Sequence, residues 1–186
     1  MARSHAIPWL SLDGDDPVPA TFRSILYAFD HPGAVVHLPK SEGLPWPLNS
    51  ASAAVLAAWI NPGTPVWTDL DWDSEPAAWL LEACGCNLVT EPCMARVSLI
   101  VEPFRMPSLT RFHLGEDDQP EISASLILQV DGFSGARSGH RGLPLTPSGL
   151  PRRFWSEWNN QRRLLPLGVD VLFTCADTVV ALPRGL

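Results

Sequence analysis

Residues 122–130, ISASLILQV, decide the fold class because four of the last five side chains in this stretch are aliphatic. A strand with so little room for a solvent-facing side is typical of a sheet that is covered on both faces. Residues 168–183, GVDVLFTCADTVVALP, add two more apolar runs, separated by a tight turn at 176–178. The sequence therefore predicts a buried sheet that ends in an antiparallel hairpin.

Helical and strand patterns alternate upstream of this stretch. In residues 21–33, TFRSILYAFDHPG, apolar side chains recur at helical spacing before a Pro-Gly pair that ends the helix. The other predicted helices are 50–60, 74–85, 152–163 and a short one around 108–112, and the other predicted strands are 34–38, 64–69, 87–90, 95–101 and 125–130. This alternation predicts an α/β fold with a mixed sheet in three layers, formed by a single domain over 21–186 after an irregular arm over 1–20.

Composition excludes several classes of protein. The chain has 186 residues, 46% of them hydrophobic, and this suits a globular domain. Only 13 Lys and Arg are present and the net charge is -7, so we expect no nucleic-acid partner. The longest apolar run, 53–60, is too short to cross a bilayer, and the first residues lack the apolar centre of a signal peptide. We therefore expect a cytoplasmic protein without a membrane partner.

A glycine-rich stretch with basic side chains, 126–143, LILQVDGFSGARSGHRGL, admits two interpretations. It lacks the Gly-Lys-Ser/Thr ending of a nucleotide P-loop, so a hairpin is the favoured interpretation. In that hairpin Gly132 and Gly135 adopt positive backbone angles and the chain returns through 137–142. The alternative is a local anion site in which Arg137, His140 and Arg141 bind phosphate or phosphonate oxygens.

Two further charged residues are weaker candidates for ligand contact. Arg23 lies on the first predicted helix, where it either pairs with an acid such as Asp30 or reaches a partner subunit. Asp170 is a polar residue inside an apolar run, so it needs a hydrogen-bond partner if it is buried. A structural carboxylate is the favoured interpretation of Asp170, and ligand contact is the alternative. The preceding Gly168 is expected to allow a close turn into the strand.

The remaining reactive residues suggest no catalytic site. Cys84, Cys86, Cys93 and Cys175 are expected to be reduced thiols, because their spacing is not a usual zinc pattern. His31, His37 and His113 lie on different predicted elements and imply no catalytic triad. Lys40 is the only lysine and lies in a loop rich in Pro and Gly. Trp67, Trp72, Trp155 and Trp158 are interpreted as core or interface residues, with Trp155 and Trp158 buried beside Phe154.

Four segments occur in the order and spacing of one protein family: FRSILYAFDHPG, TPVWTDL, LGEDDQPEISASLILQV and LPLGVDVLFTCADTVVALPR. They resemble the PhnH family, the H subunit of the bacterial carbon-phosphorus lyase system. The resemblance runs from about residue 22 to residue 184, and its most specific parts are the opening FR…PG and the closing PLG-V-D…LPR. The first twenty residues, residues 103–113 and the Cys84–Cys86 pair depart from the family, so no function is transferred to them.

The resemblance implies a fold like a reduced large domain of pyridoxal-phosphate-dependent transferases. It also implies a homodimer that assembles with the G, I and J subunits. That complex supports the formation of alpha-D-ribose 1-methylphosphonate 5-triphosphate from ATP and methylphosphonate. The family's catalytic centres are placed in the partner subunits, so the resemblance assigns no catalytic residue and no cofactor to this chain.

Two alternatives of other classes remain. One is a free-standing protein that binds a small anion such as phosphate or phosphonate. The other is an independent enzyme of the pyridoxal-phosphate type, which rests on fold kinship alone.

Overall fold

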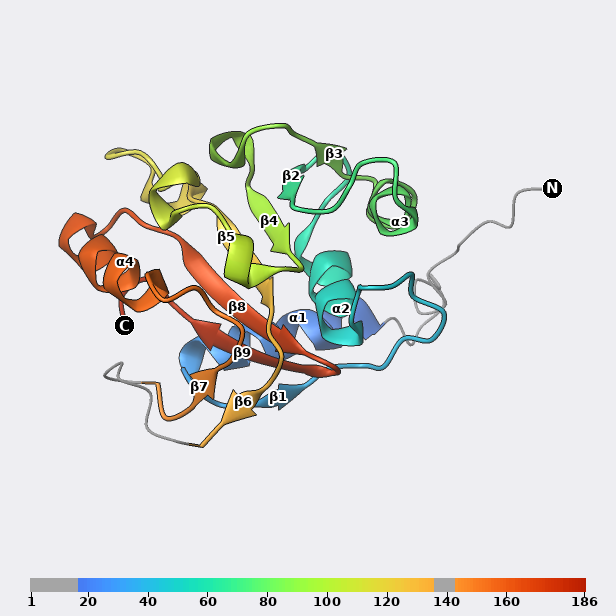
Figure 1. Cartoon of the computed structure of the whole chain (residues 1–186), viewed down its shortest axis with the longest axis horizontal. Helices are drawn as coiled ribbons and strands as arrows, with labels where there is room; N and C mark the ends of the chain where they lie inside the picture. Colours follow the sequence, from blue (N-terminus) through green and yellow to red (C-terminus); the bar gives the residue numbers. More distant parts are fainter. Residues whose placement is uncertain (1–16, 136–142) are drawn as a thin grey trace.

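A computed structural model describes residues 17–135 and 143–186, and its centre is a seven-stranded sheet (Figure 1). The neighbours β3, β2, β4, β5 and β8 are parallel, whereas β9 runs antiparallel to both β8 and β1. The predicted mixed α/β fold and its C-terminal hairpin are confirmed. In spatial order the strands are β1 (Val36–His37), β9 (Thr178–Leu182), β8 (Asp170–Cys175), β5 (Ser125–Gln129), β4 (Val97–Ile100), β2 (Pro65–Thr68) and β3 (Asn87–Leu88).

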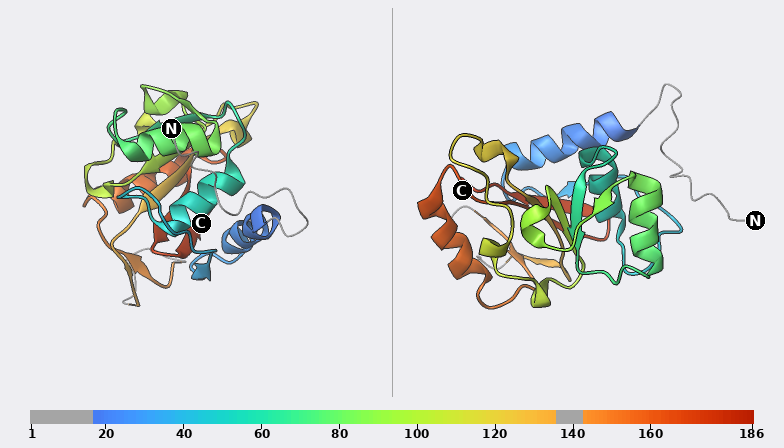
Figure 2. Two further views of the ribbon diagram at one scale, coloured as in Figure 1. Left: turned by 90° about the vertical axis from the view of Figure 1, so that its right-hand side faces the viewer. Right: turned by 90° about the horizontal axis from the view of Figure 1, so that it is seen from above.

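The central strands β4, β5, β8 and β9 are mostly apolar and buried because both faces of the sheet are covered. In β5, Ile127 packs into one hydrophobic cluster while its neighbours Leu126 and Leu128 pack into another. The first cluster includes residues of α1 (Pro17–Asp30), α2 (Ser50–Trp59) and α3 (Glu75–Cys84), and the second includes residues of α4 (Phe154–Gln161). The helices α1 and α4 thus lie on opposite sides of the sheet, which makes the middle of three layers (Figure 2).

Local signals set the helix ends. The side chain of Asn49 accepts a hydrogen bond from the Ser52 amide (2.8 Å) at the start of α2. Ser74 caps α3 in the same way, and Gly85 ends it with a left-handed backbone (φ 62°). The first helix begins at Pro17, four residues before the predicted start, and proline is well tolerated in the first turn of a helix.

Short 3-10 turns replace regular helices in the long connections. The predicted short helix around 108–112 is a single turn, η3 (Leu109–Arg111). The others are η1 (Pro92–Met94), η2 (Pro103–Arg105), η4 (Pro120–Ile122) and η5 (Arg162–Leu164). In α4, Phe154 and Trp158 are buried as predicted, but Trp155 is only half-buried.

The glycine-rich stretch begins a hairpin, which was the favoured interpretation. The strand β6 (Phe133–Ser134) pairs antiparallel with β7 (Thr146–Pro147), and the predicted return through 137–142 lies outside the described residues. The expected positive angles at Gly132 and Gly135 are wrong, because the positive φ near this hairpin falls on Gly149 (84°), against the Asp131 carboxylate. Leu143 and Leu145, which precede β7, are buried in the core. Among the described residues, none of the helices has the length and apolar character needed to span a membrane.

Candidate functional site

The carboxyl edge of the parallel strands is where α/β proteins usually bind ligands, often at a helix N-terminus. In this chain α2 starts at that edge, but its first amides already have protein acceptors. The Ala51 amide donates to the Ala176 carbonyl (2.9 Å), and the Asn49 amide donates to the Gln129 side chain (2.9 Å). Together with the Asn49 cap on Ser52, these bonds use most of the amides at this helix start that a phosphate could bind.

Asp69 joins the carboxyl ends of β2 and β4. Its two oxygens accept hydrogen bonds from the amides of Val101 (2.8 Å) and Glu102 (2.9 Å). Asp69 is an exposed residue, but partial desolvation of its carboxyl group raises the pKa of Asp69 above its ordinary value. The two amide hydrogen bonds act in the opposite direction. Asp69 is therefore a bridge between two strands, with both oxygens engaged.

A small charged cluster surrounds the turn between β8 and β9. One oxygen of Asp177 lies 3.4 Å from Nδ1 of His37 and 3.6 Å from Nζ of Lys40. Burial alone would raise the pKa of Asp177, but the contacts with His37, its own amide and Lys40 outweigh it and hold the pKa below its ordinary value. The Lys40 side chain is 78% exposed, so this is a surface ion pair of small energetic weight.

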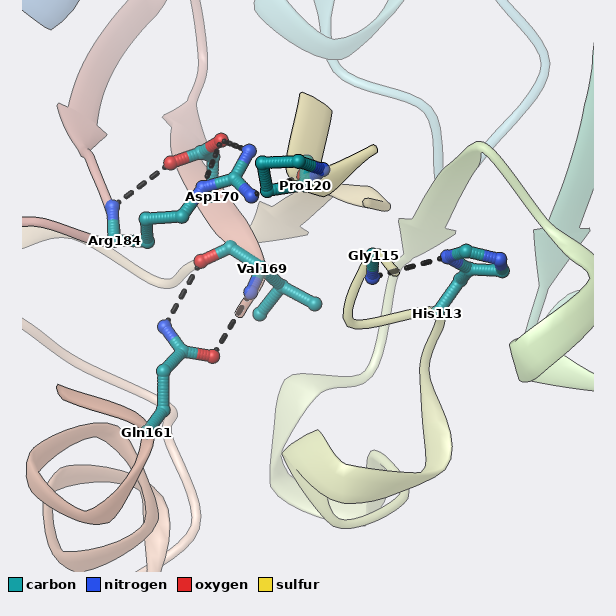
Figure 3. Close-up of polar contacts among 7 residues, drawn as sticks. All are labelled: His113, Gly115, Pro120, Gln161, Val169, Asp170 and Arg184. Atoms are coloured by element: carbon teal, nitrogen blue, oxygen red, sulfur yellow. Dashed lines mark hydrogen bonds and ion pairs between the residues drawn. The ribbon is translucent and has the colours of Figure 1, made fainter. Parts of the chain in front are cut away.

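The opposite, amino edge of the sheet holds a denser polar network (Figure 3). Asp170 starts β8, and its oxygens accept hydrogen bonds from the backbone amide (2.8 Å), Nε (3.1 Å) and Nη2 (2.6 Å) of Arg184. The guanidinium also donates to the Pro120 carbonyl (2.8 Å) through Nη1. Arg184 is therefore the partner that Asp170 needed, and it joins the end of β9 to the connection before β5. These contacts favour the structural role of Asp170, and ligand contact by it stays a prediction.

Beside this ion pair, an amide side chain completes the start of β8 (Figure 3). Gln161, the last residue of α4, donates through Nε2 to the Val169 carbonyl and accepts through Oε1 from the Val169 amide, each at 2.9 Å. Gly168 allows the close approach, because it has a φ of 131° and a Cβ there would lie 2.8 Å from the Gln161 side chain. The expected close turn at Gly168 is confirmed.

The loop from His113 to Ala124 is tied to the same edge. The Gly115 amide donates to Nδ1 of His113 (3.1 Å), so Nδ1 is the unprotonated ring nitrogen in this contact (Figure 3). The carbonyl of His113 accepts from the Ala124 amide, and that of Leu114 accepts from the Gly168 amide, each at 2.7 Å. The network thus joins α4, β5, β8, β9 and this loop.

Only two of the predicted site residues, Arg23 and Asp170, lie in the part of the chain that the structure describes. Arg137, His140 and Arg141 lie outside the described residues, so the proposed anion patch stays a prediction. Arg23 is exposed on α1, and the pairing with Asp30 is wrong, since among the described ion pairs none joins the two. Gln161 and Arg184 were given no role from the sequence, although both carry the network.

Cys84 and Cys86 are protonated thiols near neutral pH. Burial, together with the nearby Cys86, raises the pKa of Cys84 to about 12, and burial also raises the pKa of Cys86. Both thiols therefore stay protonated near neutral pH, whereas metal binding and nucleophilic attack use the thiolate. Within the described part of the chain, no three His, Cys, Asp or Glu side chains are grouped as metal ligands.

Comparison with known proteins identifies the family. The family model described as bacterial phosphonate metabolism protein (PhnH) matches residues 16–186. The chain belongs to the PhnH family. A relative from Rhizobium meliloti (strain 1021) is 29% identical over 181 residues, which covers 91% of this chain and 90% of that protein. It is named alpha-D-ribose 1-methylphosphonate 5-triphosphate synthase subunit PhnH.

The segments that carry the PhnH resemblance have structural roles in this chain. Gly33, in the opening segment, has a φ of 87°, and a Cβ there would overlap the ring of Pro144. Gly168, Asp170 and Arg184, in the closing segment, belong to the network at the amino edge. The family match begins at residue 16, earlier than the resemblance at residue 22, and spans residues 103–113 as well.

Proposed function

We propose that this PhnH chain is an accessory subunit of a complex that forms alpha-D-ribose 1-methylphosphonate 5-triphosphate from ATP and methylphosphonate. The observation that carries the proposal is the match to the family of phosphonate metabolism proteins over residues 16–186. The name of the Rhizobium meliloti relative supplies the reaction and the role as a subunit. The geometry is compatible with an accessory role, because Asp69, Asp170 and Gln161 use their polar atoms to join elements of this chain.

Reconstitution of the synthase tests this proposal. The complete complex from the host of this chain, given ATP and methylphosphonate, should release adenine, and the complex prepared without this chain should lose most of that activity. The chain alone should release none. Adenine release by the chain alone would overturn the accessory role, and full activity of the complex without it would overturn the proposed function.

The partners belong to the same proposal. We infer that the chain pairs with itself and assembles with the G, I and J subunits. A face of α1 favours self-association, because Phe22 and Leu26 are 40% and 42% exposed and Phe22 lies beside Trp59, with ring centroids 5.5 Å apart. Exposed aromatic and aliphatic side chains on one helix face are typical of surfaces that are buried on association.

The resemblance implies a fold like that of pyridoxal-phosphate-dependent transferases. We nevertheless predict that this chain forms no catalytic aldimine with pyridoxal phosphate. That chemistry needs a lysine held at the cofactor ring and kept partly unprotonated. Lys40, the only lysine, lies in a loop with a side chain that is 78% exposed, so its amine is not held in a fixed, enclosed position of the kind that this chemistry needs. The test is to add pyridoxal phosphate, reduce with borohydride and map the modified peptides. A stoichiometric adduct at Lys40, lost in Lys40→Ala together with an aminotransferase activity, would contradict the prediction.

A further inference from the structure

The outer face of α4 is polar and contains no acid. Phe154 and Trp158 point into the core and are 1% and 0% exposed. On the opposite side Ser156, Asn159 and Arg163 follow one another at helical spacing, and all three are exposed. The acid of this helix, Glu157, is engaged elsewhere, because it pairs with Arg153 (3.1 Å) and accepts from the Leu109 amide (3.0 Å). The exposed face therefore carries only positive charge.

The arginines at the two ends of this face have no acidic partner. Among the described residues, Arg23, Arg96, Arg152, Arg162 and Arg163 form no ion pair, whereas Arg105, Arg111, Arg153 and Arg184 each do. Three of the five without an ion pair therefore lie at the two ends of this one face. Arg162 and Arg163 lie at the C-terminus of α4, where positive charge interacts favourably with the helix dipole. The helix dipole explains why positive charge is favourable here, but it supplies no hydrogen-bond acceptor for the guanidinium groups.

Most acids of this protein lie elsewhere, although Glu116, Asp117, Asp118 and Glu121 lie in the loop that is tied to the same edge of the sheet as the end of α4. Residues 41–95 contain no Lys or Arg but carry seven acids, namely Glu42, Asp69, Asp71, Asp73, Glu75, Glu82 and Glu91. The helix α3, which belongs to this acidic part, lies at the other end of the molecule from α4 (Figures 1 and 2). Salt screens charges beyond about 8 Å, so the seven acids of residues 41–95 do not neutralise the arginines at the two ends of α4.

Two leucines make this basic face partly apolar. Leu164 and Leu165, which directly follow the arginines, are 44% and 45% exposed. The helix dipole gives no reason for exposed leucines. Arginine is enriched in protein interfaces and among the residues that carry most of their binding energy, and exposed apolar side chains beside it add surface that association can bury.

We propose that the outer face of α4 together with η5 and Leu165 is a docking surface for an acidic surface of another subunit. This inference rests on the proposed function and adds a location and a sign of charge to it. A symmetric pairing of two copies through this face would set arginines against arginines, because a twofold interface brings the same patch together. A different, acidic protein is therefore the expected occupant.

Charge reversal on this surface tests the inference. The wild-type chain, Arg163→Glu and the control Lys40→Glu are each titrated against the purified remainder of the complex. Lys40→Glu makes the same change of charge on an exposed side chain at the opposite edge of the sheet. Arg163→Glu should bind at least about tenfold more weakly, whereas Lys40→Glu should bind like the wild type. Wild-type binding should also weaken as salt is raised.

Three other results of these experiments would contradict the proposed docking surface, and they can be told apart. Equal binding by Arg163→Glu and the wild type, with both variants folded by circular dichroism, would overturn the docking surface and leave the proposed function intact. Failure of the wild type to bind the remainder at any salt concentration would overturn the proposed function as well. Light scattering of the chain alone gives the third outcome, since a smaller mass for Arg163→Glu than for the wild type would place self-association on this face.

Discussion

Replacing Asp170 by alanine should lower the free energy of unfolding by about 2–4 kcal/mol. The carboxylate holds the backbone and guanidinium of Arg184, and both side chains are largely buried, at 20% and 19% exposed. Without it, the Arg184 guanidinium keeps its contact with Pro120 but loses the acceptor for Nε and Nη2. An unpaired charge in such a place costs far more than a lost surface contact. Urea unfolding followed by circular dichroism measures the change.

Asp177 provides the matched control because it lies just beyond the other end of β8. Its contacts with His37 and Lys40 are longer, and those partners are 73% and 78% exposed. Asp177→Ala should therefore shift the urea midpoint much less than Asp170→Ala. Equal shifts for the two variants would show that the Asp170–Arg184 pair has no special weight in this fold.

The elements that the sequence predicted well depend on residues that are close together along the chain. Asn49 and Ser74 bond to amides three residues later, and Gly85 closes α3 with its own backbone angle. The aliphatic run of β5 and the tight turn at Ala176 are equally local. Patterns of this kind appear in the sequence because the interaction and its signal occupy the same few residues.

The errors fall where contacts between distant segments decide the backbone. A positive backbone angle was expected at Gly132, but the close approach that needs one lies at Gly149, opposite Asp131. The glycines themselves carry no information about which distant residue approaches them.

The sequence contains signals that could have indicated part of the amino-edge network. A tight turn at 176–177 fixes the register of β8 and β9 so that Val171 pairs with Leu182, and this brings Arg184 near Asp170. Gln161 also left a signal, because it occupies an inward helical position after Phe154 and Trp158. A polar residue in such a position needs a partner, but only the structure shows that the partner is the backbone of Val169.

The network also connects the fold to the proposed docking surface. Gln161 is the last residue of α4 and directly precedes η5, which carries Arg162 and Arg163. The two hydrogen bonds from Gln161 to Val169 fix the end of this helix against the sheet. The place of the basic side chains on the surface therefore depends on the contact beneath them.

Gly168→Ala should lower the free energy of unfolding by about 2–4 kcal/mol through two separable causes. One is backbone strain, because a φ of 131° is unfavourable for any residue with a side chain. The other is steric, since the new Cβ would lie 2.8 Å from Cγ and Cδ of Gln161 and push the amide away from Val169. Chemical denaturation of the variant measures the total.

A double-mutant cycle with Gln161→Ala separates these causes. Gln161→Ala alone should cost about 2–3 kcal/mol, because the buried amide and carbonyl of Val169 lose their partner. If steric displacement of Gln161 is a main cause, the double variant should be at least about 1 kcal/mol more stable than the sum of the single effects predicts, since no side chain remains to be displaced. Strict additivity would instead assign the whole effect of Gly168→Ala to backbone strain. In that case the close packing of Gly168 on Gln161 would not be what positions the end of α4.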